Sequence, residues 1–383
     1  MRVLVIAHNA VAASNRQRVD ALAALPDTDV TLLTPSWWFE EGRRIDVPPT
    51  RPWHVGRTLG TGNSTRYVYL SRLFGLVRRL QPEVIDVHEE PFSFSAFQTL
   101  LGRELLAARA ALVFYSAVNV DRRWRPPYRW VERLVLSRAD AAYVPGGEVP
   151  GVLRRKGFSG PIATIPLGAD VERFSRADPT GLSVPRPIIG FLGRLEPVKG
   201  VDVLIEAAAR LTQPASVVIA GQGSELDRLR HLGASHHLEE RVLFLGEQPY
   251  ARVPGFLKAL DVLVLPSVTI LPLHKEQFGR VLVEAMAAGT AVVGSTSGAI
   301  PEVIGDAGLV VPERDPSALA QALDRLLGNP ALHASLVERG RARVASHYAW
   351  PVVAARTRGL YTQAVAHRLG RAVGDVEAAE VRA

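Results

Sequence analysis

The chain has 383 residues, 47% of them hydrophobic and 22% charged, an ordinary globular composition that excludes a disordered, collagenous or low-complexity protein. It contains no cysteine, which excludes disulfide frameworks, zinc–thiolate sites, iron–sulfur clusters and cysteine nucleophiles. The net charge of +7 lies almost entirely in residues 1–180, but the excess is small and no nucleic-acid-binding motif accompanies it, so nucleic acid is not an expected partner.

The chain opens with an apolar run, residues 3–7, that is too short for the core of a signal peptide and predicts a buried strand. No uninterrupted apolar run reaches the length of about 18 residues that a membrane-spanning helix needs. We therefore expect a cytoplasmic protein without a transmembrane helix.

Short apolar runs alternate with segments of helical periodicity along both halves of the chain. The runs are continuously apolar, which is typical of parallel strands covered by helices on both faces. Repeated strand–helix units predict an α/β fold. The predicted strands are residues 3–7, 30–33, 84–87, 112–115 and 141–144 in the first half and 188–192, 217–220, 242–245, 262–265, 291–293 and 309–311 in the second.

The length predicts two to three domains at about 150 residues each. The alternation of strands and helices breaks once along the chain. Residues 169–186 are rich in proline and poor in apolar periodicity, which indicates a linker. A fresh strand follows at once, so we predict two Rossmann-like domains, 1–168 and 187–349. In open parallel sheets ligands bind beyond the carboxyl ends of the strands, so functional residues are expected in strand-to-helix loops.

The strongest group of candidate residues follows the predicted strand 262–265. A helix is expected to begin near Phe278 or Gly279, and the free amides of a helix N-terminus favour a phosphate. Glu276 precedes this helix and Glu284 lies on its second turn, so both carboxylates flank that position. Either glutamate alone would be interpreted as solvated, but their joint placement favours a functional site.

The loop after strand 188–192 carries a second candidate pair, Arg194 and Lys199, bracketed by glycines. A guanidinium can donate to two oxygens at once and an ammonium acts as a point charge, so the pair suits a diphosphate. An ordinary solvated charge pair is the alternative. Because the chain has only four lysines among its basic residues, we favour the diphosphate.

A third loop, residues 218–226, contains Gly221 and Gly223 after a predicted strand. The third glycine of the dinucleotide fingerprint is missing, so the motif does not favour NAD binding. Close approach of this backbone to a ligand remains open.

These motifs resemble those of the retaining glycosyltransferases of family 4, and so do residues 265–267 and 297–303 and the segment 165–174. The resemblance is dense from about 162 to 361 and weaker before that. It implies the GT-B fold: two facing Rossmann-like domains with parallel sheets. It also implies that residues 350–383 form a C-terminal helix that crosses back to the N-terminal domain, followed by a tail.

The resemblance also assigns roles to the candidate residues. Glu276 would hold the donor sugar near the reacting carbon, as a catalytic residue, and Glu284 would bind the ribose. The donor diphosphate would be bound by Gly193, Arg194, Lys199, Phe278, Gly279, Arg280 and Val281. Family members transfer a sugar from a nucleotide-diphosphate donor with retention, by front-face attack and without a protein nucleophile. A hexose-type sugar on UDP or GDP and a hydroxyl acceptor are therefore expected.

The loop after the first strand, residues 8–18, departs from the family pattern because it lacks the glycine pair of many members. His8 and Asn9 are candidates for the acceptor side. Arg16 and Arg18 are electrostatic substitutes for the missing contacts, with a solvated helix face as the alternative for both.

A histidine that many members carry after strand 112–115 is also missing. Ser116 and Asn119 follow that strand instead and are acceptor-side candidates. His88, at the end of strand 84–87, is the nearest replacement and the second catalytic candidate. A structural, hydrogen-bonded histidine is the alternative.

Two acidic motifs superficially suggest a metal. His88, Glu89 and Glu90 are adjacent, but neighbouring strand residues point to opposite faces, so we expect no metal there. The segment 27–29 resembles the aspartate motif of metal-dependent glycosyltransferases, but it lies at the wrong edge of the sheet and predicts a turn. No metal or other cofactor is expected beyond the nucleotide sugar as co-substrate.

Residues 66–79 and 122–133 are dense in arginine and aromatic residues. Such surfaces suit peripheral contact with an anionic membrane or an anionic acceptor, and a solvated, packed helix face is the alternative. Two other functions stay open: a non-catalytic protein that binds sugar nucleotides or membrane surfaces, and a sugar-nucleotide epimerase of the same fold.

Overall fold

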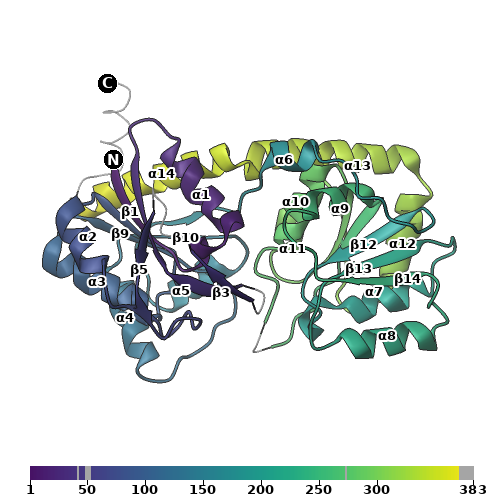
Figure 1. Ribbon diagram of the computed structural model, residues 1–383, viewed down its shortest axis with the longest axis horizontal. Coiled ribbons are helices and arrows are strands. Elements are labelled where there is room, and N and C mark those ends of the chain that lie inside the picture. Colours follow the sequence, from purple (N-terminus) through teal and green to yellow (C-terminus); the bar gives the residue numbers. More distant parts are fainter. Residues whose placement is uncertain (41–42, 48–52, 272–273, 371–383) are drawn as a thin grey trace. The chain divides into compact units, whose positions relative to one another are not determined.

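A computed structural model describes residues 1–40, 43–47, 53–271 and 274–370, and the tail expected after about residue 370 lies outside them. The chain divides into two compact units. The first comprises Met1–Pro166 and the chain from Trp350 onward, and the second is Leu167–Ala349. Each unit is built on a parallel sheet covered by helices on both faces (Figure 1).

Within the described residues, the first unit has a seven-stranded parallel sheet in the order β11-β10-β9-β8-β1-β2-β5. The chain runs outward from β1 through β2 to β5, then returns to the other side of β1 with β8. Its strands are β1 (Arg2–Ile6), β2 (Asp29–Pro35), β5 (His54–Gly56), β8 (Val84–Val87), β9 (Ala111–Tyr115), β10 (Ala141–Val144) and β11 (Ile162–Thr164).

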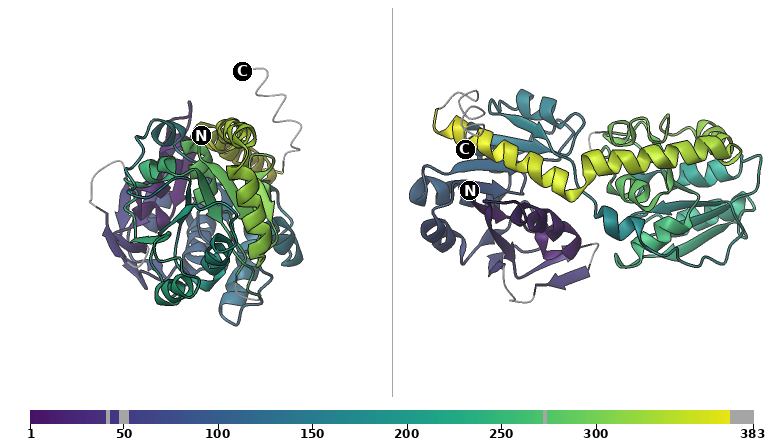
Figure 2. Two further views of the ribbon diagram at one scale, coloured as in Figure 1. Left: turned by 90° about the vertical axis from the view of Figure 1, so that its right-hand side faces the viewer. Right: turned by 90° about the horizontal axis from the view of Figure 1, so that it is seen from above.

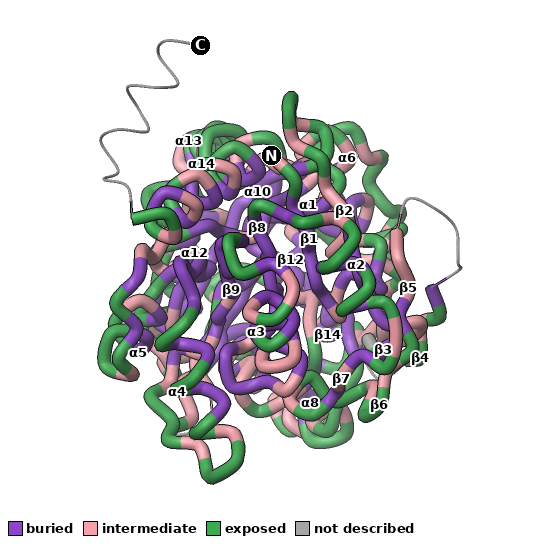
Figure 3. Tube along the Cα trace, turned by 90° about the vertical axis from the view of Figure 1, so that its left-hand side faces the viewer, coloured by how far each residue is buried: buried purple, intermediate pink, exposed green. Residues whose placement is uncertain are grey.

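Alternate side chains of the central strand β1 supply two hydrophobic cores. Leu4 and Ile6 join the cluster under α2, α3 and α4, and Val3 and Val5 join the cluster under α1 and α14. The central strands are therefore buried along their length, as Figure 3 shows. The helices are α1 (Ala13–Ala23), α2 (Leu73–Leu80), α3 (Phe94–Leu106), α4 (Tyr128–Arg138), α5 (Val149–Arg155) and α14 (Trp350–Arg368), with a 3-10 turn η1 (Asn9–Val11).

Helix α14 is the last described element and belongs to the first unit. It packs along α1 and across β8, β9 and β10 (Figure 2). The Tyr361 hydroxyl donates to Asp86 of β8 at 2.6 Å, and Trp350 Nε1 donates to Gln17 at 2.9 Å. Of the helices in the described ranges, none has the length and apolarity needed to cross a bilayer.

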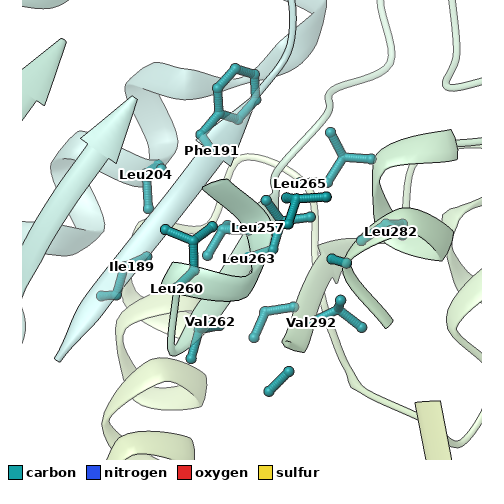
Figure 4. Packing of buried hydrophobic residues seen from close by; sticks show 14 of the residues in the cluster. Ile189, Phe191, Leu204, Leu257, Leu260, Val262, Leu263, Leu265, Leu282 and Val292 are labelled. Atoms are coloured by element: carbon teal, nitrogen blue, oxygen red, sulfur yellow. The ribbon is translucent and has the colours of Figure 1, made fainter. Parts of the chain in front are cut away.

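The second unit has a six-stranded parallel sheet among its described residues, in the order β14-β13-β12-β15-β16-β17. Its strands are β12 (Ile188–Leu192), β13 (Ser216–Ala220), β14 (Val242–Gly246), β15 (Val262–Leu265), β16 (Ala291–Ser295) and β17 (Leu309–Val311). Its helices are α6 (Val171–Ser175), α7 (Val201–Ala208), α8 (Leu226–Ser235), α9 (Val253–Ala259), α10 (Arg280–Ala288), α11 (Ile300–Ile304), α12 (Pro316–Leu327) and α13 (Pro330–Arg343). Figure 4 shows strand residues such as Ile189 and Leu263 packed against Leu257 of α9 and Leu282 of α10.

All the predicted strands are present, with ends that differ by at most two residues. The strands that the sequence did not indicate are short or polar: the hairpins β3 (Trp37–Glu40)–β4 (Arg43–Asp46) and β6 (Thr58–Leu59)–β7 (Val68–Tyr69), and the edge strands β5 and β11. Two to four residues offer too little periodicity to separate a strand from a loop.

The segment 169–186 differs from the linker that its composition predicts. Asp170 accepts a hydrogen bond from the Arg173 amide and thereby caps the short helix α6. Phe174 of this helix is fully buried in the second core. The start of the segment is therefore an integral part of the second unit.

Candidate functional site

Helix α10 begins at the carboxyl edge of the second sheet. Gly279 is its N-cap with φ +82°, a conformation that favours glycine, and a Cβ there would lie 2.9 Å from Leu265 Cδ2. Arg280 is the first helical residue, one or two residues later than the sequence indicated. The first amides of the helix have no intrahelical acceptor and carry the positive end of its dipole, which suits an anion.

Lys199 and Glu276 form a largely buried ion pair beside this helix. Lys199 Nζ donates to Glu276 Oε2 at 2.6 Å, and Ser267 Oγ donates to the same oxygen at 2.8 Å. Burial alone raises the pKa of the Glu276 carboxyl, but the Lys199 ammonium and the hydrogen bonds outweigh it and lower the pKa below the ordinary value. Glu276 is thus an ionised acceptor at neutral pH.

Backbone contacts between loops fix the positions of this pair. Gly200, with φ +63°, lets its loop approach the strand end so closely that a Cβ would lie 2.1 Å from the Pro266 carbonyl oxygen. Gly298, with φ +55°, would place a Cβ 1.9 Å from the Glu276 carbonyl oxygen. The Ala299 amide donates to that oxygen at 3.1 Å. The loops after β12, β15 and β16 therefore form one rigid frame.

The second glutamate, Glu284, is buried on α10, and Arg280 Nε lies 3.5 Å from its Oε1. Burial, and after it the Glu284 charge, raises the pKa of the nearby Tyr250 to about 12. Arg194 is half exposed and pairs with Glu196 at 2.6 Å.

Two of the residues expected to bind the diphosphate, Phe278 and Val281, have apolar side chains that pack in the core and cannot bind an anion. Phe278 is buried in the second core, with its ring 6.0 Å from Tyr348, and Val281 packs partly against the same core. Only their backbone amides are available to an anion.

The Gly221–Gly223 loop approaches another loop of the chain. A Cβ at Gly221 would lie 1.9 Å from the Gly193 carbonyl oxygen, and one at Gly223 would lie 2.2 Å from that of Leu195. The Leu195 amide donates to the Gln222 carbonyl at 2.8 Å. These glycines support the Arg194 loop, which explains them without a nucleotide contact.

In the first unit, Arg18 and His88 lie in a buried network and not on an open crevice. Arg18 Nη2 donates to Asp86 Oδ2 at 2.6 Å, and the Tyr143 hydroxyl lies 2.8 Å from His88 Nδ1. The His88 ring stacks on Tyr115 at 4.2 Å. Burial, with the Arg18 charge, lowers the pKa of His88 well below its ordinary value. His88 is thus buried and hydrogen-bonded, and the Arg18 guanidinium is paired with Asp86.

Arg16 also serves the local structure. Its guanidinium donates to the carbonyls of Ala10 and Val11 and thereby closes the turn η1 against α1. The Arg16 side chain is thus partly buried.

Ser116 and Asn119 are buried at the end of β9. Ser116 Oγ donates to Glu90 Oε2 at 2.7 Å, and the Ala117 amide donates to Oε1 at 2.8 Å. Burial outweighs these bonds and raises the pKa of Glu90 to about 7. This role of Glu90 was not predicted from the sequence, because the contact joins two strand ends that are 26 positions apart.

His8 and Glu89 meet at the ends of β1 and β8. His8 Nδ1 lies 2.6 Å from Glu89 Oε2, and the Tyr67 hydroxyl donates to Oε1 at 2.6 Å. A cavity of about 100 Å³ adjoins this group. It is lined by His8, Asn9, Val11, Ala12, Asn15, Trp38 and Phe39.

The adjacent residues His88, Glu89 and Glu90 thus bind three different sets of partners. In the part of the chain that the structure describes, no group of three or more histidine, cysteine or acidic side chains could hold a metal ion. Asp27 lies in the turn before β2 with φ +56°, as its position predicted.

Comparison with known proteins places this geometry in a family. Residues 15–173 match the family "Glycosyltransferase Family 4", and residues 174–343 match "Glycosyl transferases group 1", so the two matches are contiguous. A D-inositol 3-phosphate glycosyltransferase of Corynebacterium jeikeium is 33% identical over 53% of this chain and 52% of its own length. A GDP-mannose-dependent mannosyltransferase of Corynebacterium glutamicum, acting on a monoacylated phosphatidylinositol monomannoside, is 34% identical over 50% of this chain and 54% of its own.

The matched regions span about half the length of these relatives, 52% and 54%. The solved structure of Anabaena HepE in complex with UDP covers 94% of this chain and 99% of its own, with a TM-score of 0.71 at 17% identity, a likeness of fold. The chain therefore belongs to the group 1, family 4 glycosyltransferases, whose GT-B fold supplies its two parallel-sheet units.

Proposed function

We propose that this chain is a retaining glycosyltransferase that moves a hexose-type sugar from a nucleotide-diphosphate sugar to a hydroxyl acceptor. The observation that carries the proposal is the Lys199–Glu276 pair, held beside the N-terminus of α10. A cation, free helix amides and an ionised carboxylate within one rigid frame suit the diphosphate and the sugar of such a donor.

Each part of the sugar-nucleotide donor then has its own binding groups. An ammonium has three N–H donors, so Lys199 can keep its bond to Glu276 and still reach a phosphate oxygen. Arg194, exposed on the neighbouring loop, supplies a second cation, and the amides of α10 supply uncharged donors. Glu276 accepts from sugar hydroxyls and Glu284 from those of the ribose.

In the proposed reaction, the acceptor hydroxyl oxygen bonds to the anomeric carbon while the bond from that carbon to the phosphate oxygen breaks. Both changes occur on the same face of the sugar, which retains its configuration. The electron pair leaves on the diphosphate, and the hydroxyl proton passes to the departing phosphate oxygen. Lys199, Arg194 and the α10 amides stabilise the charge that develops there, so the protein acts by electrostatic stabilisation.

The names of the relatives indicate which donors and acceptors to test first. One is named for GDP-mannose, and HepE was solved with UDP, which makes GDP and UDP the first donors to test. The named acceptors of both curated relatives are inositol derivatives, so polyol acceptors are tested first.

The test is a thermal-shift panel with UDP, GDP, ADP, dTDP and their sugar conjugates, with NAD as the control. We expect a selective rise in melting temperature with one diphosphate, then release of that diphosphate from its sugar conjugate when an acceptor is added. No stabilisation by any diphosphate would contradict the donor site. Binding without transfer would favour the non-catalytic binding protein, and conversion of the donor sugar itself would favour the epimerase.

A further inference from the structure

The ends of β1 and β8 form the topological switch point of the first sheet. From β1 the chain proceeds to β2 on one side and later returns with β8 on the other. Loops diverge above such a point, and the crevice between them is the preferred ligand site of an open parallel sheet. His8 and Glu89 each follow their strand by two residues, and their side chains join across this crevice.

The hydrogen bonds of Glu89 define which imidazole nitrogen of His8 carries the proton. Glu89 is buried and accepts from the His8 amide at 2.9 Å and from the Tyr67 hydroxyl. Both oxygens lie within 2.7 Å of His8 Nδ1. Since this carboxylate is an acceptor throughout, Nδ1 bears a hydrogen, and in the neutral tautomer that this bond favours Nε2 presents a lone pair.

That lone pair is available to a ligand. Within the described residues Nε2 makes no hydrogen bond, and one fifth of the His8 side chain, 20%, is exposed. The ring is held in place by Trp38, whose centroid lies 4.5 Å away, and by Tyr67 at 5.9 Å. His8 is thus an oriented acceptor with little freedom to turn.

The walls of the adjoining cavity combine apolar and uncharged polar surface. Val11 and Ala12 are apolar, Phe39 is an exposed aromatic side chain, and Asn9 adds an amide. No lysine or arginine lines the cavity within the described residues. Apolar faces with a few hydrogen-bonding groups and no lysine or arginine match a hydroxylated ring better than a phosphate.

We propose that this cavity binds the hydroxylated ring of the acceptor, a sugar or cyclitol, with one ring hydroxyl donating to His8 Nε2. The proposal rests on the proposed function, whose acceptor it defines. Glu89 is the positioning residue, because it fixes the tautomer and the direction of the imidazole. Trp38, which also lines the cavity, and Tyr67 support that geometry by packing against the imidazole.

The first experiment follows the histidine nitrogens by ¹⁵N NMR while myo-inositol, D-mannose or inorganic phosphate is added to the full chain. We expect His8 with Nε2 unprotonated, and ring signals that move with a polyol but not with phosphate. His8→Gln should lower polyol affinity by about tenfold, the loss of one hydrogen bond. His231→Gln, on α8 of the second unit, is the matched control and should leave that affinity unchanged.

Glu89→Gln tests the positioning role. The amide no longer requires a proton on Nδ1, so the His8 signals should shift toward the Nε2-protonated tautomer and polyol affinity should fall. A merely structural role would lower the melting temperature without changing the tautomer. Tyr67→Phe removes one donor to Glu89 but keeps the ring, and should preserve the tautomer in a folded protein.

Three results would overturn the proposal: signals that respond to phosphate alone, no response to any polyol, or unchanged polyol affinity in His8→Gln. Nucleotide binding is measured in the same samples by thermal shift. If polyols bind and no nucleotide does, the proposed function is contradicted, but the proposal that the cavity binds a polyol is supported. If nucleotides bind and His8→Gln keeps polyol affinity, only the cavity proposal fails.

Discussion

Lys199 and Glu276 each depend on the charge of the other. Replacing Lys199 by Ala removes a phosphate contact and leaves a carboxylate buried without its cation. We expect nucleotide affinity to fall by about 1.5–3 kcal/mol, roughly 10- to 150-fold, the value of one hydrogen bond to a charged group. Calorimetry with the diphosphate found in the thermal-shift panel measures the change. Lys258→Ala, on α9 of the same unit, is the matched control, and equal affinities in both variants would remove Lys199 from the site.

Glu276 should separate turnover from binding. Glu276→Gln keeps the shape of the side chain but removes the charge that would orient sugar hydroxyls, so transfer should fall much more than nucleotide affinity. Steady-state kinetics with parallel calorimetry gives both quantities. An equal loss of the two would assign Glu276 to binding or to structure.

The lowered pKa of Glu276 also has a consequence for stability. A carboxyl whose pKa is lower in the folded state stabilises the fold above its unfolded pKa and loses that contribution as pH falls. The stability difference between wild type and Glu276→Gln should therefore be constant near neutral pH and shrink below about pH 4.5, which urea unfolding at several pH values measures. A difference that does not change with pH would contradict the ion pair.

Glu90 should show the opposite dependence. Its pKa is raised from 4.5 to about 7 by burial, so the folded state retains a proton that the unfolded state has released. Its contribution is thus greatest below pH 4.5 and is lost as pH rises to about 7. The stability of wild type relative to Glu90→Gln should fall over that interval, again by urea unfolding. A flat difference would mean that Glu90 is solvated in solution.

Among the elements, α10 depends on the backbone conformation of its N-cap, Gly279, for the position of its first turn. Gly279→Ala would force a Cβ into the left-handed region and against Leu265. We expect a loss of about 1–2 kcal/mol in unfolding free energy and weaker nucleotide binding, since the first amides would shift. Gly233→Ala on α8, where a Cβ meets nothing within 4 Å, is the control and should be neutral or slightly stabilising. A stable Gly279→Ala variant with unchanged affinity would contradict the role of the cap.

The sequence predicted the long apolar strands and the approximate start of α10 because continuous apolar runs and helical periodicity are local properties. It also predicted Lys199 and Glu276 as candidates, but not that they form an ion pair, because they are 77 positions apart. The His8–Glu89 and Glu90–Ser116 contacts were missed for the same reason. The pairing of Arg18 with Asp86 was not predicted either, because a sequence cannot show which arginine contacts a buried aspartate.

At the scale of the whole molecule, the excess positive charge lies in residues 1–180. Arg123, Arg125 and Arg129 are exposed around the start of α4, and so is Trp130. We propose peripheral attraction to anionic membranes through this surface. Sedimentation with phosphatidylglycerol vesicles should carry the protein down at low salt and release it as salt rises. Binding to neutral vesicles alone, or none at low salt, would contradict this.

The path of the chain has a consequence for its synthesis. The strands of the first unit are complete by residue 164, but Tyr361, Leu360 and Val353 of α14 complete the cluster that covers Val3 and Val5. During translation the whole second unit must emerge before that covering helix exists. One apolar sheet face, which also carries the Asp86 carboxylate, is therefore covered by α1 but not yet by α14 on the ribosome. A chaperone that shields this face there would limit misassembly of the nascent chain.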